Sequence, residues 1–184
     1  MKEKILPLLL FICLILPFSA LAQSKGLKII FIRHAEKPAN GDNLNCQGLN
    51  RSLQLPAVLF KKFGKPDQVY IPTITTGSTT RHLRMLQTIS PFVIKYGLSI
   101  NSAFDVDDTK GVATSLIREN GTVLVVWEHQ ALVPILKYLG ADSKELKWPP
   151  DDFDTIWIVT FKKGRAILTT DKESLSPGSG CPIL

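Results

Sequence analysis

Apolar runs alternate along the chain with stretches of helical periodicity. Residues 28–32 and 122–127 consist almost entirely of β-branched, aliphatic and aromatic side chains. Such runs predict strands that are buried on both faces, as in a parallel sheet. Shorter runs predict strands over residues 67–71 and 98–104. Residues 155–161 and 165–170 predict a β-hairpin that turns at Lys162-Lys163-Gly164.

Helical periodicity fills the stretches between these strands. Four helices are predicted, over residues 49–63, 80–96, 109–120 and 132–139, and a glycine directly follows each of them. Strands that alternate with helices predict an α/β fold, here a three-layer α-β-α sandwich with a mainly parallel central sheet. No internal repeat or second domain is visible.

The first 22 residues have the features of a cleaved secretory signal. A basic start at residues 1–4 precedes an apolar run over residues 5–18, which is short beside the roughly 20 apolar residues of a membrane-spanning helix. Ala20 and Ala22 occupy the positions that a signal peptidase recognises. We expect cleavage after Ala22, a domain of residues 23–184, export to the periplasm or the medium, and no stable membrane anchor after cleavage. An uncleaved anchor is the alternative.

The charge of the chain is basic without being extreme. The formal net charge is +6, and removal of a leader with two lysines and one glutamate leaves +5. Lysines and arginines do not cluster as they do in a nucleic-acid-binding surface, so we expect no nucleic-acid partner. The excess fits either an anionic substrate or a solvated surface, and arginines at the positions described below favour the substrate.

Two cysteines, Cys46 and Cys181, remain after removal of the leader. In an oxidising compartment an even pair can form a disulfide that ties the C-terminal tail to the domain. Two free thiols are the alternative, because a sequence does not give the distance between them.

Two of the apolar strands run into a histidine. Arg33-His34 follows the first, and Glu128-His129 follows the later one. Parallel strands present their carboxyl ends at one edge of the sheet, where α/β proteins bind ligands. The loop at Gly77–Thr80 opens a helix that contains Arg81 and Arg84, and the N-terminus of a helix favours anions. These groups together predict a site for an anion such as phosphate.

Four segments resemble motifs of the histidine phosphatase superfamily, which includes phosphoglycerate mutases and many acid phosphatases. The segments are Arg33-His34-Ala35 at the first strand end, Leu44–Arg51, the R-x-x-Q-T segment Arg84–Thr88, and His129 after the late strand. The resemblance covers essentially the whole mature chain. Each motif alone is weak, but their order and spacing together identify the chain as similar to this superfamily and imply a phosphoglycerate mutase-like fold.

The resemblance implies catalysis through a phosphohistidine on His34, which must be neutral to attack phosphorus. Arg33, Arg84 and His129 would bind the phosphoryl oxygens and neutralise the charge of the transition state. Such a pocket needs no cofactor, and the sequence contains no convincing cluster of metal ligands. Arg81 lies one helical turn before Arg84 and is either a further pocket residue or a solvated one.

The general acid is where the sequence departs from the superfamily pattern. Related mutases use a glutamate in a region that here offers Asp105, Asp107 and Asp108. We expect Asp105, because it directly follows a predicted strand. Glu128 is the rival, but as the strand neighbour of His129 it should face the opposite way. Gln130 is a poor proton donor, and Glu36 is expected to be a structural residue or a residue of the pocket rim.

The segment Trp148–Asp154 resembles part of small members of the superfamily. Its aromatic residues are expected to pack in the core, with a place on the pocket wall as the alternative.

The sequence therefore predicts an exported phosphatase that acts on phosphomonoesters of unspecified, small-molecule or macromolecular, nature. A binding protein that retains the phosphate pocket but not the turnover is the alternative.

Overall fold

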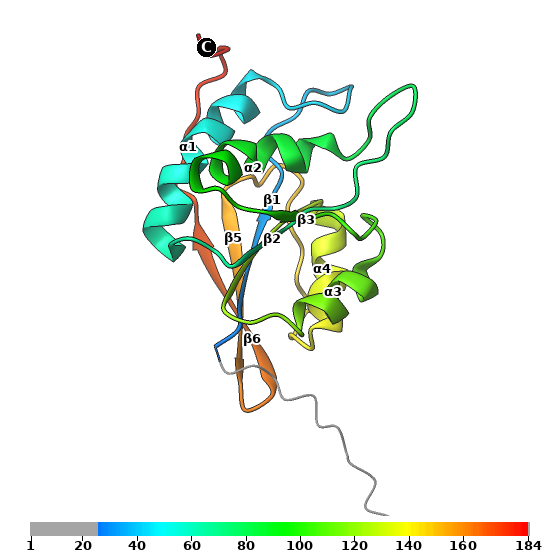
Figure 1. The fold of residues 1–184 in the computed structure, drawn as a ribbon. Helices are drawn as coiled ribbons and strands as arrows, with labels where there is room; N and C mark the ends of the chain where they lie inside the picture. The colour runs from blue at the N-terminus through cyan, green and yellow to red at the C-terminus, as the bar shows by residue number, and fades with distance from the viewer. Residues whose placement is uncertain (1–25, 184) are drawn as a thin grey trace, which may run out of the picture.

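A six-stranded sheet forms the middle of the computed structural model, which describes residues 26–183 (Figure 1). The predicted signal over residues 1–22 lies outside the described residues. The strands are β1 (Lys28–Arg33), β2 (Gln68–Tyr70), β3 (Ile100–Asn101), β4 (Thr122–Trp127), β5 (Thr155–Lys162) and β6 (Arg165–Lys172). The helices are α1 (Cys46–Phe63), α2 (Leu83–Tyr96), α3 (Thr109–Leu116) and α4 (His129–Tyr138).

The strand order β3-β2-β4-β1-β5-β6 places β1 inside the sheet, between β4 and β5. The first four strands are parallel, and the β5–β6 hairpin is antiparallel. Residues Lys163 and Gly164 turn the hairpin, both with positive φ, as the right-handed twist of the strands favours. In the pairing of β1 with β4, Arg33 lies opposite Trp127, so the two strands end at the same level.

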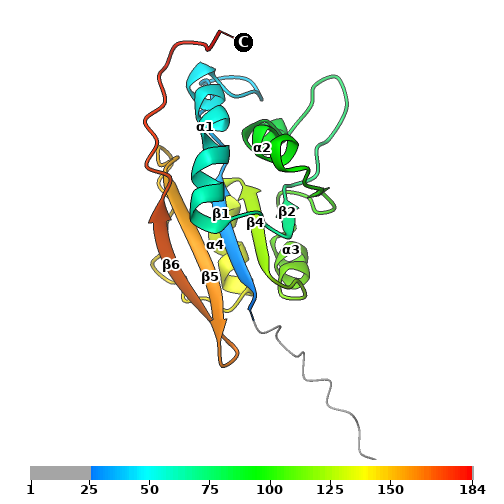
Figure 2. The same cartoon turned by 60° about the vertical axis from the view of Figure 1, so that its left-hand side comes forward.

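Helices cover both faces of the sheet (Figures 1 and 2). Side chains alternate between the faces of a strand, and in β1 this alternation divides the core into two layers. Ile29 and Phe31 pack in the layer that includes α3 and α4, whereas Ile30 and Ile32 pack in the layer that includes α1 and α2. The prediction of a three-layer sandwich with a mainly parallel sheet and a phosphoglycerate mutase-like fold is confirmed.

Element boundaries differ from the predicted ones at several places: α1 begins three residues earlier and α2 three residues later than predicted. Strand β3 has only two residues, because only Ile100 and Asn101 pair with β2. Helix α3 ends four residues early, because the chain passes into a turn after Leu116. Helix α4 begins at His129 instead of Leu132, so Glu128 and His129 belong to a strand-to-helix junction and not to a strand. At this junction Glu128 is the N-cap of α4 and His129 is its first residue, so the two side chains do not alternate as they would in a strand.

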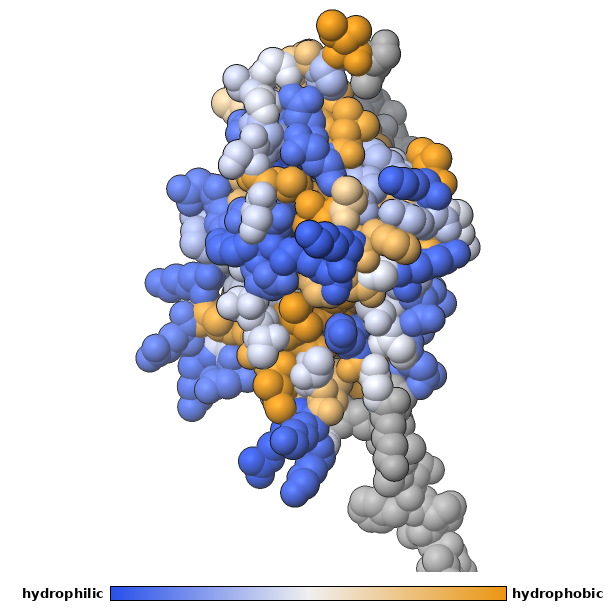
Figure 3. Space-filling model, turned by 90° about the vertical axis from the view of Figure 1, so that its left-hand side faces the viewer, coloured by the Kyte–Doolittle hydropathy of each residue, from blue (hydrophilic) through white to orange (hydrophobic). Residues whose placement is uncertain are grey.

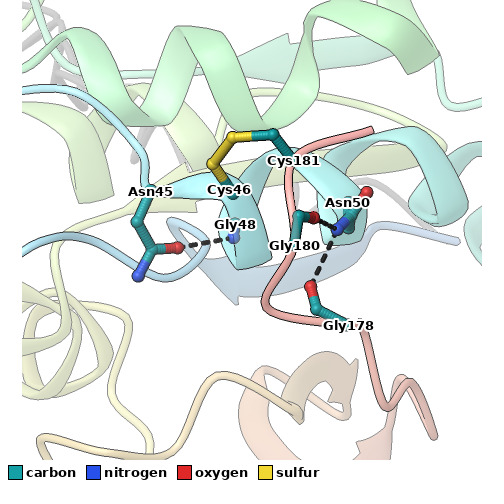
Figure 4. Close-up of a disulfide and its surroundings, with 7 residues drawn as sticks. All are labelled: Asn45, Cys46, Gly48, Asn50, Gly178, Gly180 and Cys181. Carbon is teal, nitrogen blue, oxygen red and sulfur yellow. Dashed lines mark hydrogen bonds between the residues drawn. A yellow bond between two sulfur atoms is a disulfide. The ribbon is translucent and has the colours of Figure 1, made fainter. Parts of the chain in front are cut away.

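The C-terminal tail lies along the beginning of α1 (Figure 4). Cys46, the first residue of α1, forms a disulfide with Cys181. The Asn50 side chain donates hydrogen bonds to the carbonyl oxygens of Gly178 (2.7 Å) and Gly180 (2.6 Å). The tail is therefore fixed to the domain by a covalent bond and by hydrogen bonds.

The face seen from the side of α1 and β6 is largely hydrophilic, with apolar groups scattered among charged ones (Figure 3). Over residues 26–183, none of the helices has the length and apolar character needed to span a bilayer.

Candidate functional site

A cavity of about 190 Å³ lies at the carboxyl ends of β1 and β4. Its walls are His34, Asp42, Arg81, His82, Arg84, Met85 and Glu128. The cavity is smaller than the roughly 300–1,000 Å³ of pockets that enclose a whole drug-sized ligand, so it suits one small chemical group. A larger cavity of about 740 Å³ lies against α4 near Val133 and Tyr138, and none of the residues predicted for the site lines it.

His34 lies directly after β1 and is almost completely buried. Its backbone N–H donates to the carbonyl oxygen of Trp127 in β4 (3.2 Å). Its Nδ1 lies 2.7 Å from the carbonyl oxygen of Ala35. A carbonyl oxygen only accepts hydrogen bonds, so Nδ1 carries the proton and Nε2 keeps a free lone pair.

The imidazole of His34 is neutral at physiological pH. Burial lowers its pKa to about 4, and the nearby charges of Arg33, Arg84 and His129 act in the same direction, against the bond to Ala35. A neutral ring with an available Nε2 meets the requirement for a nucleophile.

Arg33, the last residue of β1, is only 3% exposed. One terminal nitrogen donates to the carbonyl oxygen of Pro150 at 2.6 Å, and the ring of Phe153 covers the guanidinium, with its centroid 4.1 Å from Cζ. Burial lowers the pKa of Arg33 to about 10, partly opposed by Glu128. The side chain therefore still carries its positive charge at neutral pH.

Arg84 lies in the first turn of α2 and lines the cavity. One terminal nitrogen donates to the carbonyl oxygen of Gly41 (2.6 Å), and it lies 3.7 Å from the carboxylate of Asp42. The loop before α1 thus contacts Arg84, a residue that is predicted to bind phosphate.

His129 is the first residue of α4 and lies beside these groups. Burial lowers its pKa, and the charges of Arg33 and Lys37 lower it further. Its neighbour Glu128 is the N-cap of α4 and lines the cavity, as the N-cap of α2, His82, also does. Neither of these side chains accepts a hydrogen bond from its helix. Two helix N-termini, which favour anions, therefore adjoin one cavity.

Three buried side-chain nitrogen atoms among the described residues have no hydrogen-bond partner. They are Nε of Arg33, Nε of Arg84 and Nδ1 of His129. Buried polar groups are normally satisfied, and an unpaired one costs roughly 1–3 kcal/mol. All three atoms belong to residues that the sequence predicted to bind phosphate. Arg84 lines the cavity, whereas Arg33 and His129 lie near His34 but are not among the lining residues.

The R-x-x-Q-T segment has three separate tasks. Arg84 lines the cavity, whereas Gln87 accepts a hydrogen bond from the backbone of Leu44 (3.0 Å) and so holds the loop before α1. The Thr88 hydroxyl accepts one from the backbone N–H of Ala35 (2.9 Å). Since the carbonyl of Ala35 holds His34, Thr88 supports the orientation of the imidazole.

The segment Leu44–Arg51 supports the residues that follow His34, because Gly48 and Arg51 both contact Glu36. Gly48 lies so close to the backbone of Glu36 that a Cβ there would collide with it. Arg51 is buried and forms ion pairs with Glu36 (2.8 Å) and Glu173 (2.5 Å). Glu36 is therefore a structural residue, in line with the expectation from the sequence.

The structure places Glu128, and not Asp105, on the cavity wall. Asp105 is exposed, and its carbonyl accepts a hydrogen bond from Asp108, which caps α3 through its side chain. Asp107 takes part in the same turn. The expectation that Glu128 faces away from His129 assumed a strand, whereas Glu128 is the N-cap of α4. Glu128 lines the cavity, and His129 is not among its lining residues.

Arg81 lines the cavity and is also exposed to solvent, so both descriptions weighed for it from the sequence apply. His82 and Asp42, which line the cavity, were not among the residues predicted for the site. Phe153 contacts Arg33 and lies near His34 without lining the cavity, and a place on the pocket wall was the alternative given for it from the sequence. A positive φ of 61° at His82 ends the loop before α2, and no pattern in the sequence indicates it. Within residues 26–183, no group of three or more His, Cys, Asp and Glu side chains is arranged to hold a metal ion.

The fold and the site together define an α/β protein of the phosphoglycerate mutase-like type. Solved structures of the histidine phosphatase superfamily share this fold with the chain. A protein histidine phosphatase SixA complexed with tungstate has a TM-score of 0.56 and 16% identity, covering 79% of this chain and 97% of that one. A mutant phosphoserine phosphatase from Entamoeba histolytica, in complex with phosphoserine, has a TM-score of 0.51 and 14% identity, with coverage of 80% and 96%.

A phosphoglycerate mutase from Bacillus anthracis gives a TM-score of 0.51 at 15% identity, covering 81% of this chain and 94% of that one. No family model matches the sequence, and no curated protein matches it. At these identities the likeness establishes the fold, and the chemistry has to be argued from the residues of this chain.

Proposed function

We propose that the protein is a phosphatase that hydrolyses phosphomonoesters through a phosphohistidine on His34. The observation that carries this proposal is the set of three unpaired buried nitrogen atoms, on Arg33, Arg84 and His129, around a neutral histidine. Arginine and imidazole donors match the oxygen atoms of a phosphoryl group. Structures with this fold that hold tungstate or phosphoserine support the same choice of ligand.

In the first step, Nε2 of His34 attacks phosphorus in line with the leaving oxygen. The new P–N bond forms while the P–O bond to the leaving group breaks, and Arg33, Arg84 and His129 stabilise the charge on the phosphoryl oxygens. In the second step, water attacks the phosphohistidine, and inorganic phosphate leaves as His34 returns to its neutral form.

We assign the acid–base role to Glu128, because it is on the wall of the same cavity as His34. Its carboxyl group donates a proton to the leaving oxygen in the first step and, as a carboxylate, accepts one from the attacking water in the second. Asp105 is the residue expected from the sequence, and it is retained as the comparison in the experiment.

We further propose that the protein is exported, with cleavage after Ala22. The signal-like leader supports this proposal, and so does the disulfide between Cys46 and Cys181, since disulfides persist mainly in oxidising compartments.

The decisive experiment compares hydrolysis of p-nitrophenyl phosphate by the wild type and by His34→Ala, with EDTA present. We expect turnover that persists with the chelator and falls at least about a thousandfold in the variant, because the nucleophile is lost. An inactive wild type that still binds phosphate would instead indicate the binding-protein alternative.

The acid is tested with Glu128→Gln and Asp105→Asn side by side. Glu128→Gln should lower kcat about a hundredfold on an alkyl phosphate and much less on p-nitrophenyl phosphate, whose leaving group needs little protonation. Asp105→Asn should behave as the wild type, and the reverse pattern would restore the original assignment.

A further inference from the structure

An irregular segment, residues 148–153, lies between α4 and β5 and surrounds the guanidinium of Arg33. One terminal nitrogen of Arg33 donates to the carbonyl oxygens of Pro150 (2.6 Å), Pro149 (3.4 Å) and Asp152 (3.4 Å). Pro149 and Pro150 have no backbone N–H, so these two residues present only acceptors to the cation. The segment binds one end of the guanidinium and leaves the Nε atom without a partner.

The ring of Phe153 lies against both Arg33 and the proposed nucleophile. Its centroid is 4.1 Å from Cζ of Arg33 and 6.1 Å from the centroid of the His34 ring. An aromatic face attracts a guanidinium, and it also prevents rotation of the planar group out of contact. The sequence alone favoured a packing role for this aromatic residue.

The segment is itself held firmly. The Asp152 carboxylate accepts hydrogen bonds from the backbone N–H groups of Asp154 (2.9 Å) and Thr155 (3.0 Å). The indole N–H of Trp148 donates to the carbonyl oxygen of Asp152 (2.7 Å), and the Trp148 ring packs on Trp157 of β5 (4.5 Å between centroids). Trp148 therefore has the packing role that the sequence predicted.

The segment is anchored to β5, which pairs with the strand that carries Arg33. Trp157 lies opposite Phe31 in the pairing of β5 with β1, and β1 ends at Arg33. The strand pair that carries the arginine therefore also carries the segment that holds its side chain. A guanidinium fixed on a rigid frame needs little reorganisation when charge develops in a transition state.

We propose that residues 148–153 are a positioning element for Arg33, and that Phe153 orients the guanidinium so that its free edge meets the phosphoryl group. The proposal rests on the phosphatase function proposed above. Phe153 acts through Arg33 and does not itself touch the reacting atoms.

A double-mutant cycle between Phe153 and Arg33 tests this proposal. Phe153→Leu should lower kcat/KM and the affinity for inorganic phosphate about tenfold, whereas Phe153→Tyr should stay within about twofold of the wild type. In an Arg33→Met background, Phe153→Leu should have less than a twofold effect, because the group it orients is gone. Phosphate affinity is measured by calorimetry, so the cycle can be completed even when turnover is slow.

Phe161→Leu is the matched control, since Phe161 is a partly buried residue further along β5. It should leave kcat/KM unchanged, although it also removes an aromatic ring. If Phe153→Leu does not fold, Asp152→Asn serves in its place, because it weakens the hydrogen bonds that shape the segment.

The outcomes separate this proposal from the phosphatase function. One outcome would overturn the positioning role alone. In it, the wild type is active, Arg33→Met abolishes the activity, and Phe153→Leu has the same effect on phosphate affinity with and without Arg33→Met. A wild type without turnover would refute the phosphatase function, and the phosphate affinities would still show whether Phe153 and Arg33 are coupled.

Discussion

The protonation state of His34 is a property of single residues and their neighbours. Burial disfavours the charged imidazole, and the cations that would bind phosphate disfavour it further. The same groups that attract the substrate therefore keep the nucleophile in its reactive form. The hydrogen bond to the carbonyl of Ala35 also fixes the tautomer.

We predict that His34 titrates with a midpoint near pH 4 in the free protein, because its pKa lies at about 4. Between this value and the usual pKa near 6.5, the unfolded chain binds a proton that the folded chain does not. Stability should consequently fall as the pH falls through this window. NMR titration of the histidine ring protons measures the midpoint, and His34→Asn assigns the signal. Added phosphate should raise the pKa, since an anion favours the imidazolium; a midpoint near 6.5 in the free protein would contradict the proposed environment.

The sequence identified Arg33, His34, Arg84 and His129 because their positions at strand ends and at a helix start are set by local patterns. It ranked Glu128 behind Asp105, because it treated Glu128 and His129 as part of a strand, whereas α4 begins at His129, three residues earlier than predicted. Phe153 reaches the site from a segment more than 100 residues away in the chain, and local patterns do not encode such distances.

At the scale of elements, α2 holds the loop that precedes α1. Gln87 binds Leu44 and Asn43, and Arg84 binds Gly41, so the loop reaches the cavity on one face of the helix. Asp42 is placed by this arrangement near Arg84, where its carboxylate competes with an incoming anion. The competition is weakened by solvent, since about half of the Asp42 side chain is exposed.

We predict that Asp42→Asn lowers KM for p-nitrophenyl phosphate two- to fivefold, roughly the effect of a single partly exposed charge. The effect should shrink at high salt, because salt screens exposed charges. Steady-state kinetics at two ionic strengths provide the measurement. Asp142→Asn is the control, since Asp142 does not line this cavity; a KM that rises in Asp42→Asn would show that Asp42 instead supports the site.

Elements with strong periodicity were predicted well, and elements defined by long-range contacts were not. Strands β1 and β4 follow their apolar runs almost to the residue. Strand β3 is shorter than its apolar run because only Ile100 and Asn101 find partners in β2. Pairing depends on the neighbouring strand, and a single segment of sequence does not show that neighbour.

At the scale of the whole molecule, the disulfide joins the start of α1 to the tail across 135 positions of the chain. Sequence left this bond open, because the distance between two cysteines follows from the complete fold. The closed loop contains most of the domain, so the bond restricts the unfolded chain strongly.

We predict that the double variant Cys46→Ser/Cys181→Ser loses about 2–5 kcal/mol of unfolding free energy. Urea denaturation with and without reductant measures the loss. Reductant should destabilise the wild type to a similar extent and leave the variant unchanged; equal stability of oxidised and reduced wild type would exclude a stabilising role.

The position of β1 inside the sheet has a consequence for the order in which the chain becomes functional. The strand is near the N-terminus, yet it pairs with β4 and β5, and its Arg33-His34 end contacts Trp127 and Pro150. A polypeptide that emerges N-terminus first from a ribosome or a translocation channel therefore presents its nucleophile long before the partners that shape it. The site around His34 is therefore incomplete until the last third of the chain, which contains most of β4 and all of β5, has emerged.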